Sequence, residues 1–207
     1  KGMVWNVREN LRSFGVEVFL STHPEEIIKT RYIDEKSNQQ IMRYDVEPKI
    51  EPLSFDFPPE WNNLYDALVI SDYNKGFLTT EKIFELTSRF VGPVFIDSKK
   101  TNLPADAYIK VNELEYERMA YCNYENLIIT RGGEGAEYKG DLYPAEKVNV
   151  FDVVGAGDTF LAALAYGYLK YGRIDKAIPL ANKAAAVAVS HRGTYVLTEE
   201  DVKKILC

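Results

Sequence analysis

From residue 67 onward the chain alternates short apolar runs with helical stretches, and this alternation constrains the fold more than any other feature. Short apolar strands separated by helices are typical of a parallel sheet that helices cover on both faces. We therefore expect an α/β fold with a mostly parallel sheet and with ligands at the carboxyl ends of the strands. The expected strands cover residues 67–71, 94–97, 108–111 and 127–130, and the expected helices cover residues 79–90 and 177–190 and begin again at Thr198.

The N-terminal third has a different pattern. Residues 2–14 predict an amphipathic helix, and residues 16–20 predict a short strand. Residues 27–33 and 39–45 alternate in polarity on either side of a polar turn, which predicts an antiparallel hairpin. A helix with no strand before it is unusual in an alternating α/β protein, so we expect an incomplete N-terminus. A second hairpin is expected through residues 138–143.

A glycine-rich turn leads into an apolar helix that we expect to begin near Gly155 or Ala156 and to pack one apolar stripe inward. The first N–H groups of a helix have no intrahelical partner, and Gly155 and Gly157 would let a phosphate approach them closely. Asp158 follows in the first turn, where a carboxylate could take the proton of an attacking hydroxyl during phosphoryl transfer. The alternative is an ordinary glycine turn followed by an acidic first-turn residue.

The longer string over residues 152–160, Asp-Val-Val-Gly-Ala-Gly-Asp-Thr-Phe, resembles the C-terminal signature of the ribokinase-like (PfkB) carbohydrate kinases. The resemblance implies that Asp158 is the catalytic base and that the amides of Gly155, Ala156 and Gly157 hold the transferred phosphate. It also implies one ribokinase-like domain over residues 1–207, a three-layer sandwich without its N-terminal strand, with a small β-hairpin lid at about residues 27–47. ATP and Mg²⁺ are the expected cofactors.

Asn112 and Glu115 follow an expected strand directly. Taken alone they read as a helix start with an Asn cap and an early acid. The family resemblance implies instead that they organise Mg²⁺ and its waters around the ATP phosphates, and carboxylate and amide oxygens suit that cation.

The string Thr130-Arg131-Gly132-Gly-Glu-Gly135 resembles the nucleotide loop of the same family. The resemblance implies that its backbone lines the ATP phosphates while Arg131 offsets their charge, and that Asn182 lies beside the adenine. The alternatives are a glycine-rich loop that enters a hairpin and an ordinary helical asparagine.

Residues on the substrate side resemble the bacterial D-glycero-β-D-manno-heptose 7-phosphate kinases. Gly2 and Asn6 resemble a sugar-recognition segment, and residues 28–31, 38–45, 71–76 and 96–100 resemble further segments of those kinases. A sugar that already carries a phosphate needs cations for it, although each basic residue alone could simply be solvated. The candidate substrate residues are Gly2, Asn6, Lys29, Arg31, Arg43, Asp72, Lys75, Asp97 and Lys99.

Charge and composition limit the other partners. The net charge of −6 argues against nucleic acid or an anionic membrane as a main partner. Cys122 and Cys207 have no spacing that suggests a metal site or a disulfide framework, so we expect reduced thiols in a cytoplasmic protein. No apolar run is long enough to cross a membrane.

Two alternatives to a heptose phosphate kinase remain open. One is a PfkB kinase for another sugar, sugar phosphate or nucleoside. The other is a degenerate kinase fold that binds nucleotide without catalysis. The reason is that the family has further segments between the positions of Leu20 and His23 and near residues 121–124, and this sequence lacks them. The expected hairpin exposes a strand edge, so a homodimer through it is a further hypothesis.

Overall fold

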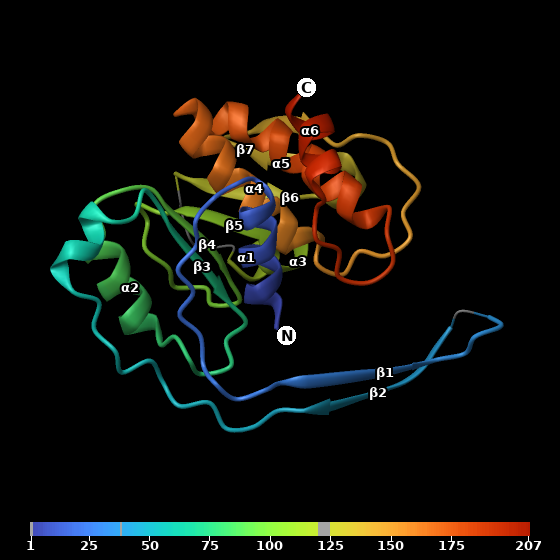
Figure 1. Cartoon of the computed structure of the whole chain (residues 1–207), viewed down its shortest axis with the longest axis horizontal. Helices are drawn as coiled ribbons and strands as arrows, with labels where there is room; N and C mark the ends of the chain where they lie inside the picture. The colour runs from blue at the N-terminus through green and yellow to red at the C-terminus, as the bar shows by residue number, and fades with distance from the viewer. Residues whose placement is uncertain (1, 38, 120–124) are drawn as a thin grey trace.

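The computed structural model of the chain describes residues 2–37, 39–119 and 125–207, and it is built around one six-stranded sheet (Figure 1). The strand order is β3-β4-β5-β6-β7-β8, with β3 to β6 parallel and the last two strands antiparallel. The expected α/β fold is confirmed. The strands are β3 (Leu68–Asp72), β4 (Val94–Ser98), β5 (Tyr108–Asn112), β6 (Leu127–Thr130), β7 (Gly135–Tyr138) and β8 (Asp141–Pro144).

Helices cover both faces of this sheet and give three layers. One face carries α1 (Met3–Ser13), α4 (Ala156–Tyr171), α5 (Ile174–Val189) and α6 (Glu199–Leu206). The other face carries α2 (Thr80–Arg89) and the 3-10 helix η1 (Pro59–Asn63). The short helix α3 (Glu113–Arg118) follows β5 directly, and the 3-10 turn η2 (Gly132–Glu134) precedes β7.

The central parallel strands are largely apolar because successive side chains enter different cores. Phe95 packs with α4 and α5, while its neighbour Ile96 packs with α2. Ile128 and Ile129 divide between the two cores in the same way. A strand whose two faces are both covered needs apolar residues at every position, and this explains the continuous runs in the sequence.

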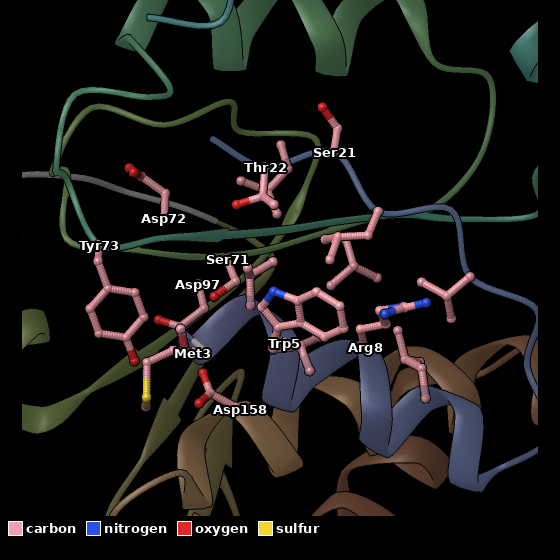
Figure 2. A pocket seen from close by; sticks show the side chains of 18 of the residues that line it. Met3, Trp5, Arg8, Ser21, Thr22, Ser71, Asp72, Tyr73, Asp97 and Asp158 are labelled. Carbon is pink, nitrogen blue, oxygen red and sulfur yellow. The ribbon is translucent and has the colours of Figure 1, made fainter. Parts of the chain in front are cut away.

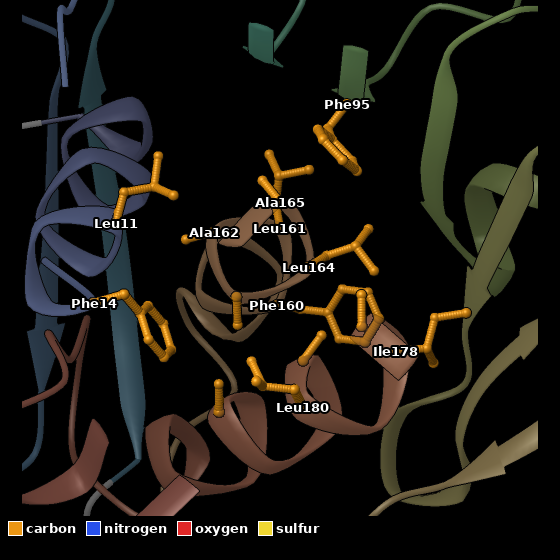
Figure 3. Close-up of a cluster of buried hydrophobic side chains, with 14 of the residues drawn as sticks. Leu11, Phe14, Phe95, Phe160, Leu161, Ala162, Leu164, Ala165, Ile178 and Leu180 are labelled. Carbon is orange, nitrogen blue, oxygen red and sulfur yellow. The ribbon is translucent and has the colours of Figure 1, made fainter. Parts of the chain in front are cut away.

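Helix α4 is buried on almost all sides (Figure 3). The single inward stripe expected for this helix is therefore wrong, because α4 lies between the sheet, α1 and α5. Small residues permit the close packing: a Cβ added to Gly167 would lie 3.0 Å from the Cα of Ala177. The N-terminus of α4, with the Gly155 turn, is consequently held by packing on several sides.

The expected lid hairpin is present and projects from the body of the molecule (Figure 1). Its strands are β1 (Ile28–Ile33) and β2 (Gln40–Val46), paired antiparallel. Asp34 stabilises the turn by accepting hydrogen bonds from the backbone and hydroxyl of Ser37. Asn38, part of the substrate resemblance, lies outside the described residues.

The strand expected at residues 16–20 is not formed. This segment is extended, but its Val16 and Val18 side chains pack against the core beside α1 without entering the sheet. Among the described strands β3 is therefore an edge strand. Alternation of polarity identified an extended chain, but hydrogen-bond partners decide whether it becomes a strand.

The described residues contain no helix long and apolar enough to span a membrane. Cys207 is a free, exposed thiol. Cys122 and residues 121–124 lie outside the described part of the chain.

Candidate active site

The carboxyl ends of β3, β4 and β5 and the N-terminus of α4 open into one cleft of about 2070 Å³. Its lining brings together Asp97 of β4, Lys110 and Asn112 of β5, and Asp158 of α4. Figure 2 shows the side chains of Asp72, Tyr73, Asp97 and Asp158 around this cleft, with Trp5 and Arg8 of α1 beside them. The position agrees with the expectation that ligands of a parallel sheet lie beyond the strand ends.

The two glycines of the signature turn are required by what lies against them. Gly155 has φ of 84°, a left-handed conformation, and a Cβ there would lie 2.8 Å from Nδ2 of Asn6. A Cβ on Gly157 would lie 2.8 Å from Nζ of Lys110. An amide and an ammonium thus approach the backbone at the start of α4, where the first helical N–H groups lack intrahelical partners.

Asp158 is almost completely buried, with 1% of its surface exposed. Its Oδ1 atom has no hydrogen-bond partner among the described residues, which is costly for a buried acceptor. Desolvation, followed by the negative charge of Asp97, raises the pKa of Asp158 to about 7. Such a carboxyl exchanges a proton readily near neutral pH, as a general base must.

Tyr73 faces the same carboxyl group (Figure 2). Its hydroxyl interacts with Asp158, and burial, followed by the charges of Asp158 and Asp97, raises the pKa of Tyr73. Tyr73 therefore stays a neutral donor beside Asp158. It lay within a segment noted in the sequence but was not predicted as a site residue.

Lys110 is a site residue that the sequence analysis missed. Its Nζ lies 2.7 Å from Oδ2 of Asp97; Lys110 is buried and Asp97 is mostly buried. Burial opposes the charged form, but Asp97 together with the charges of Glu115 and Asp158 outweighs it, and the pKa of Lys110 is raised. The available signal was a lysine between Ile109 and Val111, in a strand that otherwise has no reason to carry a charge.

Helix α1 supports the site from the other end of the chain. Asn6 Nδ2 donates to the Gly155 carbonyl oxygen at 3.2 Å, while Gly2 caps the helix at the mouth of the cleft. The fully buried Asn10 donates to Asn6 Oδ1 at 2.9 Å and accepts from the Leu197 backbone at 3.0 Å. Asn10 positions Asn6 and was not anticipated, since a buried asparagine shows no pattern without its partners.

Asn112 and Glu115 form the capping box of α3. Asn112 Oδ1 accepts from the Glu115 N–H at 2.9 Å, and Glu115 Oε2 accepts from the Asn112 N–H at 3.0 Å. The second carboxylate oxygen, Oε1, lies 3.3 Å from Nζ of Lys99. The helix-start interpretation is thus realised, and both residues line the cleft.

These oxygens fit Mg²⁺ in one specific manner. No group of three or more His, Cys, Asp or Glu side chains suited to a metal occurs among the described residues. Mg²⁺ commonly binds through one or two carboxylates together with substrate phosphates and water, and does not need an all-protein cage. Asn112 and Glu115 match that mode and do not match a permanent metal site.

The glycine loop after β6 has its arginine engaged by carboxylates. Arg131 pairs with Glu113 at 2.7 Å and with Glu137 at 2.7 Å. Thr130 Oγ1 donates to the Val111 carbonyl oxygen at 3.1 Å. The role expected for Arg131 beside the ATP phosphates remains a prediction and requires these ion pairs to open.

The other residues predicted for the nucleotide site differ in whether they are accessible to a ligand. They are Gly132, Gly135 and Asn182. Gly132 has φ of 53° and open space around it, which leaves its backbone accessible. A Cβ on Gly135 would overlap the carbonyl oxygen of Tyr143, so this glycine is needed for the β7–β8 pairing. Asn182 Nδ2 donates to the same Tyr143 oxygen at 2.7 Å and so ties α5 to β8.

On the substrate side, Asp72 is held within the protein. It is buried and contacts Lys100 Nζ at 2.6 Å and Ser98 Oγ at 2.7 Å. Lys75 pairs with Glu47 at 2.6 Å at the edge of the cleft. The predicted contact of Asp72 with substrate remains untested, and its visible role is to join the ends of β3 and β4.

The lid carries the remaining cations on a single face. Lys29 pairs across the strands with Asp45, and Arg31 pairs with Arg43. Two arginines directly opposite each other repel, which is unfavourable unless an anion binds between them. Arg43 also contacts Asp45, and Lys29 and Arg31 line the same cleft as Asp158.

Comparison with known proteins agrees with this geometry. Residues 99–201 match the family model described as pfkB family carbohydrate kinase. The chain is 30% identical over 231 residues to the Bifunctional protein HldE of a Nitratiruptor species, covering 97% of this chain and 50% of that protein. It is 30% identical over 221 residues to the Bifunctional protein HldE of Pasteurella multocida, covering 91% and 46%. The chain therefore spans about half the length of the curated relatives it matches.

Solved structures agree on the fold. A phosphofructokinase-2 mutant from Escherichia coli superposes with a TM-score of 0.68 at 16% identity, covering 97% of this chain and 85% of that one. The ribokinase of Thermotoga maritima superposes with a TM-score of 0.62 at 21% identity, covering 86% and 68%.

Proposed function

The chain belongs to the pfkB family of carbohydrate kinases, and from this premise we propose that it transfers the γ-phosphoryl group of Mg·ATP to a hydroxyl of a sugar phosphate. The observation that carries the proposal is the buried Asp158 carboxyl in the first turn of α4, where the first backbone amides have no partner within the helix. A base next to an anion-binding helix start is the arrangement that phosphoryl transfer requires.

Asp158 and the backbone amides of the Gly155 turn have separate parts in the reaction. Asp158 takes the proton of the acceptor hydroxyl as its oxygen bonds to the γ-phosphorus. The bond from that phosphorus to the bridging oxygen breaks, and its electron pair leaves with ADP. The N–H groups of Gly155 to Gly157 would stabilise the negative charge that gathers on the transferring group. The Ala156 N–H would first leave the Val153 carbonyl oxygen, 3.3 Å away.

Asn112 and Glu115 would hold the water shell of Mg²⁺, whose charge offsets that of the ATP phosphates when the ion is bound. Gly132 and Thr130 lie at the carboxyl end of β6 and would contact the nucleotide phosphates through backbone groups. Asn182 would fix the position of the adenine. These assignments rest on the match of each residue to the family pattern.

We propose the 1-hydroxyl of D-glycero-β-D-manno-heptose 7-phosphate as the acceptor, in the synthesis of ADP-heptose for lipopolysaccharide. The relatives named Bifunctional protein HldE support this choice, as do the lid segments that resemble heptose 7-phosphate kinases. The opposed pair Arg31 and Arg43, with Lys29 on the same face, would take the phosphate that the sugar already carries. Such a reaction uses the ATP of the cytoplasm.

The lid also suggests a homodimer. An isolated two-stranded hairpin is at best marginally stable in water, and this one exposes several large apolar side chains. They are Ile28, Tyr32, Ile33, Ile41, Met42 and Tyr44. We propose that two lids pair, and that light scattering will give a dimer mass which Ile41→Glu lowers to that of a monomer. A monomeric mass for the unaltered chain refutes the pairing.

The test of function is ADP formation by the purified protein with Mg²⁺ and a panel of acceptors. The panel contains heptose 7-phosphate, fructose 6-phosphate, ribose and adenosine. Turnover confined to the heptose phosphate supports both reaction and substrate. Turnover on another acceptor keeps the kinase and rejects the heptose, and nucleotide binding without any turnover favours the non-catalytic alternative.

A further inference from the structure

We propose that Lys110 is a catalytic residue whose ammonium binds the phosphoryl group during transfer. The inference rests on the proposed kinase function and adds a residue that neither the signature nor the family resemblance contains. Lys110 enters from the middle layer, on β5, whereas the Gly155 turn belongs to the outer layer. The two meet only in the folded protein.

The position of the ammonium carries the argument. Nζ lies 2.8 Å from where a Cβ on Gly157 would be, directly against the first turn of α4. A cation beside the positive end of a helix dipole is unfavourable unless an anion lies there as well. The ammonium and the first N–H groups of α4, which lack partners within the helix, therefore converge on one place, which is suited to a phosphoryl group with several negative oxygens.

The neighbouring carboxylates do not fully satisfy these charges. Asp97 accepts one hydrogen bond from the ammonium, which has three donors. Asp158, the next acid, is almost wholly buried and keeps Oδ1 without a partner among the described residues. An unpartnered buried oxygen so close to the turn is a second, independent sign that a ligand completes this cluster.

In the transfer step Lys110 keeps its proton. The acceptor oxygen bonds to the γ-phosphorus, its proton passes to Asp158, and the electron pair of the broken bond leaves with ADP. Charge spreads over the three equatorial oxygens of the transferring group, and Lys110 binds one of them while Asp97 fixes its direction. ADP lacks that group, so Lys110 makes no such contact with ADP.

The competing explanation is that Lys110 only neutralises Asp97. The chain provides a matched control in the pair Lys100 and Asp72, separated by 2.6 Å and similarly buried. In the described part of the chain Lys110 lines the cleft and Lys100 does not. Replacing each lysine by methionine removes a buried ion pair in both cases, but removes a cation from the cleft only with Lys110.

The test compares the unaltered chain with Lys110→Met, Lys110→Arg and Lys100→Met. Calorimetry measures binding of Mg·ADP and of a non-hydrolysable Mg·ATP analogue, and turnover is measured with the preferred acceptor. For Lys110→Met we expect analogue affinity to fall about tenfold or more, the range for a charge-assisted hydrogen bond, with ADP affinity unchanged. We expect kcat to fall at least about 100-fold, as for loss of one oxyanion donor. Lys110→Arg should restore part of both.

Lys100→Met should lower the unfolding temperature as much as Lys110→Met but spare the preference for the analogue over ADP. The inference is overturned if Lys110→Met binds the analogue as the unaltered chain does, or if Lys100→Met loses as much analogue affinity. The binding experiment needs no acceptor, so it decides the role of Lys110 even if the unaltered chain proves inactive. Inactivity on every acceptor would count against the proposed function alone.

Discussion

Asn6 donates from Nδ2 toward Oδ2 of Asp158 across 3.5 Å, so the first helix of the chain holds a carboxyl group 152 residues away. The same nitrogen is 3.2 Å from the Gly155 carbonyl oxygen. One buried amide thus fixes both the turn that would bind phosphate and the group that would act as base. The N-terminal helix is therefore part of the site as well as part of the core.

Asn6→Ala should lower kcat and also raise the apparent pKa of activity, because the Asn6 hydrogen bond lowers the pKa of Asp158. Loss of a buried partner should cost about 1–3 kcal/mol of stability. Rate–pH profiles and denaturant unfolding measure the two effects. Asn62→Ala is the control, since Asn62 bonds only exposed backbone near η1. An unchanged pH profile in Asn6→Ala would contradict the coupling.

The unaltered enzyme should gain activity as pH rises. The pKa of Asp158 is raised to about 7, chiefly by burial, and only its deprotonated form can accept a proton. We expect kcat/KM to increase tenfold per pH unit below that value and to level off above it. A kcat/KM that does not change between pH 5 and 8 would show that Asp158 is not the base.

Asp158→Asn should lower kcat by about 10²- to 10⁴-fold, the usual cost of losing a general base, while nucleotide binding persists. The thermal stability of Asp158→Asn should instead exceed that of the unaltered chain at high pH. Folding raises the pKa of the Asp158 carboxyl from 3.8 to about 7, because the buried charge is unfavourable. The folded chain therefore becomes less stable as the pH rises from 3.8 to about 7. The variant should therefore melt higher than the unaltered chain at pH 8.

That difference should disappear well below pH 3.8, where the carboxyl is protonated whether the chain is folded or unfolded. Thermal melts at a series of pH values measure it. A variant that is less stable than the unaltered chain at every pH would mean that the carboxylate contributes to the fold, against this account.

The two glycines of the turn should respond differently to alanine. Gly155→Ala places a side chain at φ of 84° and against Asn6, so stability should fall by about 1–2 kcal/mol or more. Gly157→Ala meets no backbone atom, only the ion-paired side chains of Lys110 and Asp97, and should cost less stability than Gly155→Ala while reducing kcat. Equal melting temperatures for the two variants would contradict the geometry of the turn.

Arg31→Ala should raise KM for a phosphorylated acceptor more than it changes kcat, because Arg31 is proposed to bind the existing phosphate far from the reacting hydroxyl. Arg173→Ala removes an exposed, paired arginine from outside the cleft and serves as the control. Steady-state kinetics with the phosphorylated sugar and its unphosphorylated form separates the two effects. An equal rise in KM for both sugars would remove Arg31 from the phosphate site.

Much of this architecture could be predicted from sequence because its signals are local. The strands around Ile70, Phe95 and Ile109 are short apolar runs, and the start of α4 follows from glycines before a helix. The cap residues Thr79 and Thr198 likewise mark the starts of α2 and α6.

What could not be predicted depends on partners that are distant in the sequence. Lys110 is explained by Asp97 and the Gly157 backbone, and Asn10 by partners that include Asn6, Thr159 and Leu197. The segment at residues 16–20 has the polarity of a strand, yet pairing requires a neighbouring edge that it does not meet. The burial of α4 on nearly all sides depends on how α1 and α5 pack around it, which the sequence of α4 alone does not specify.

Phosphorus NMR of the reaction mixture tests the central claim most directly, because it observes the transferred group itself. With Mg·ATP and heptose 7-phosphate, we predict a new phosphate ester on the sugar that appears at the rate of ADP formation, and none with Asp158→Asn. ADP formation with inorganic phosphate as its only companion, or an equal rate of ester formation by Asp158→Asn, would contradict the account.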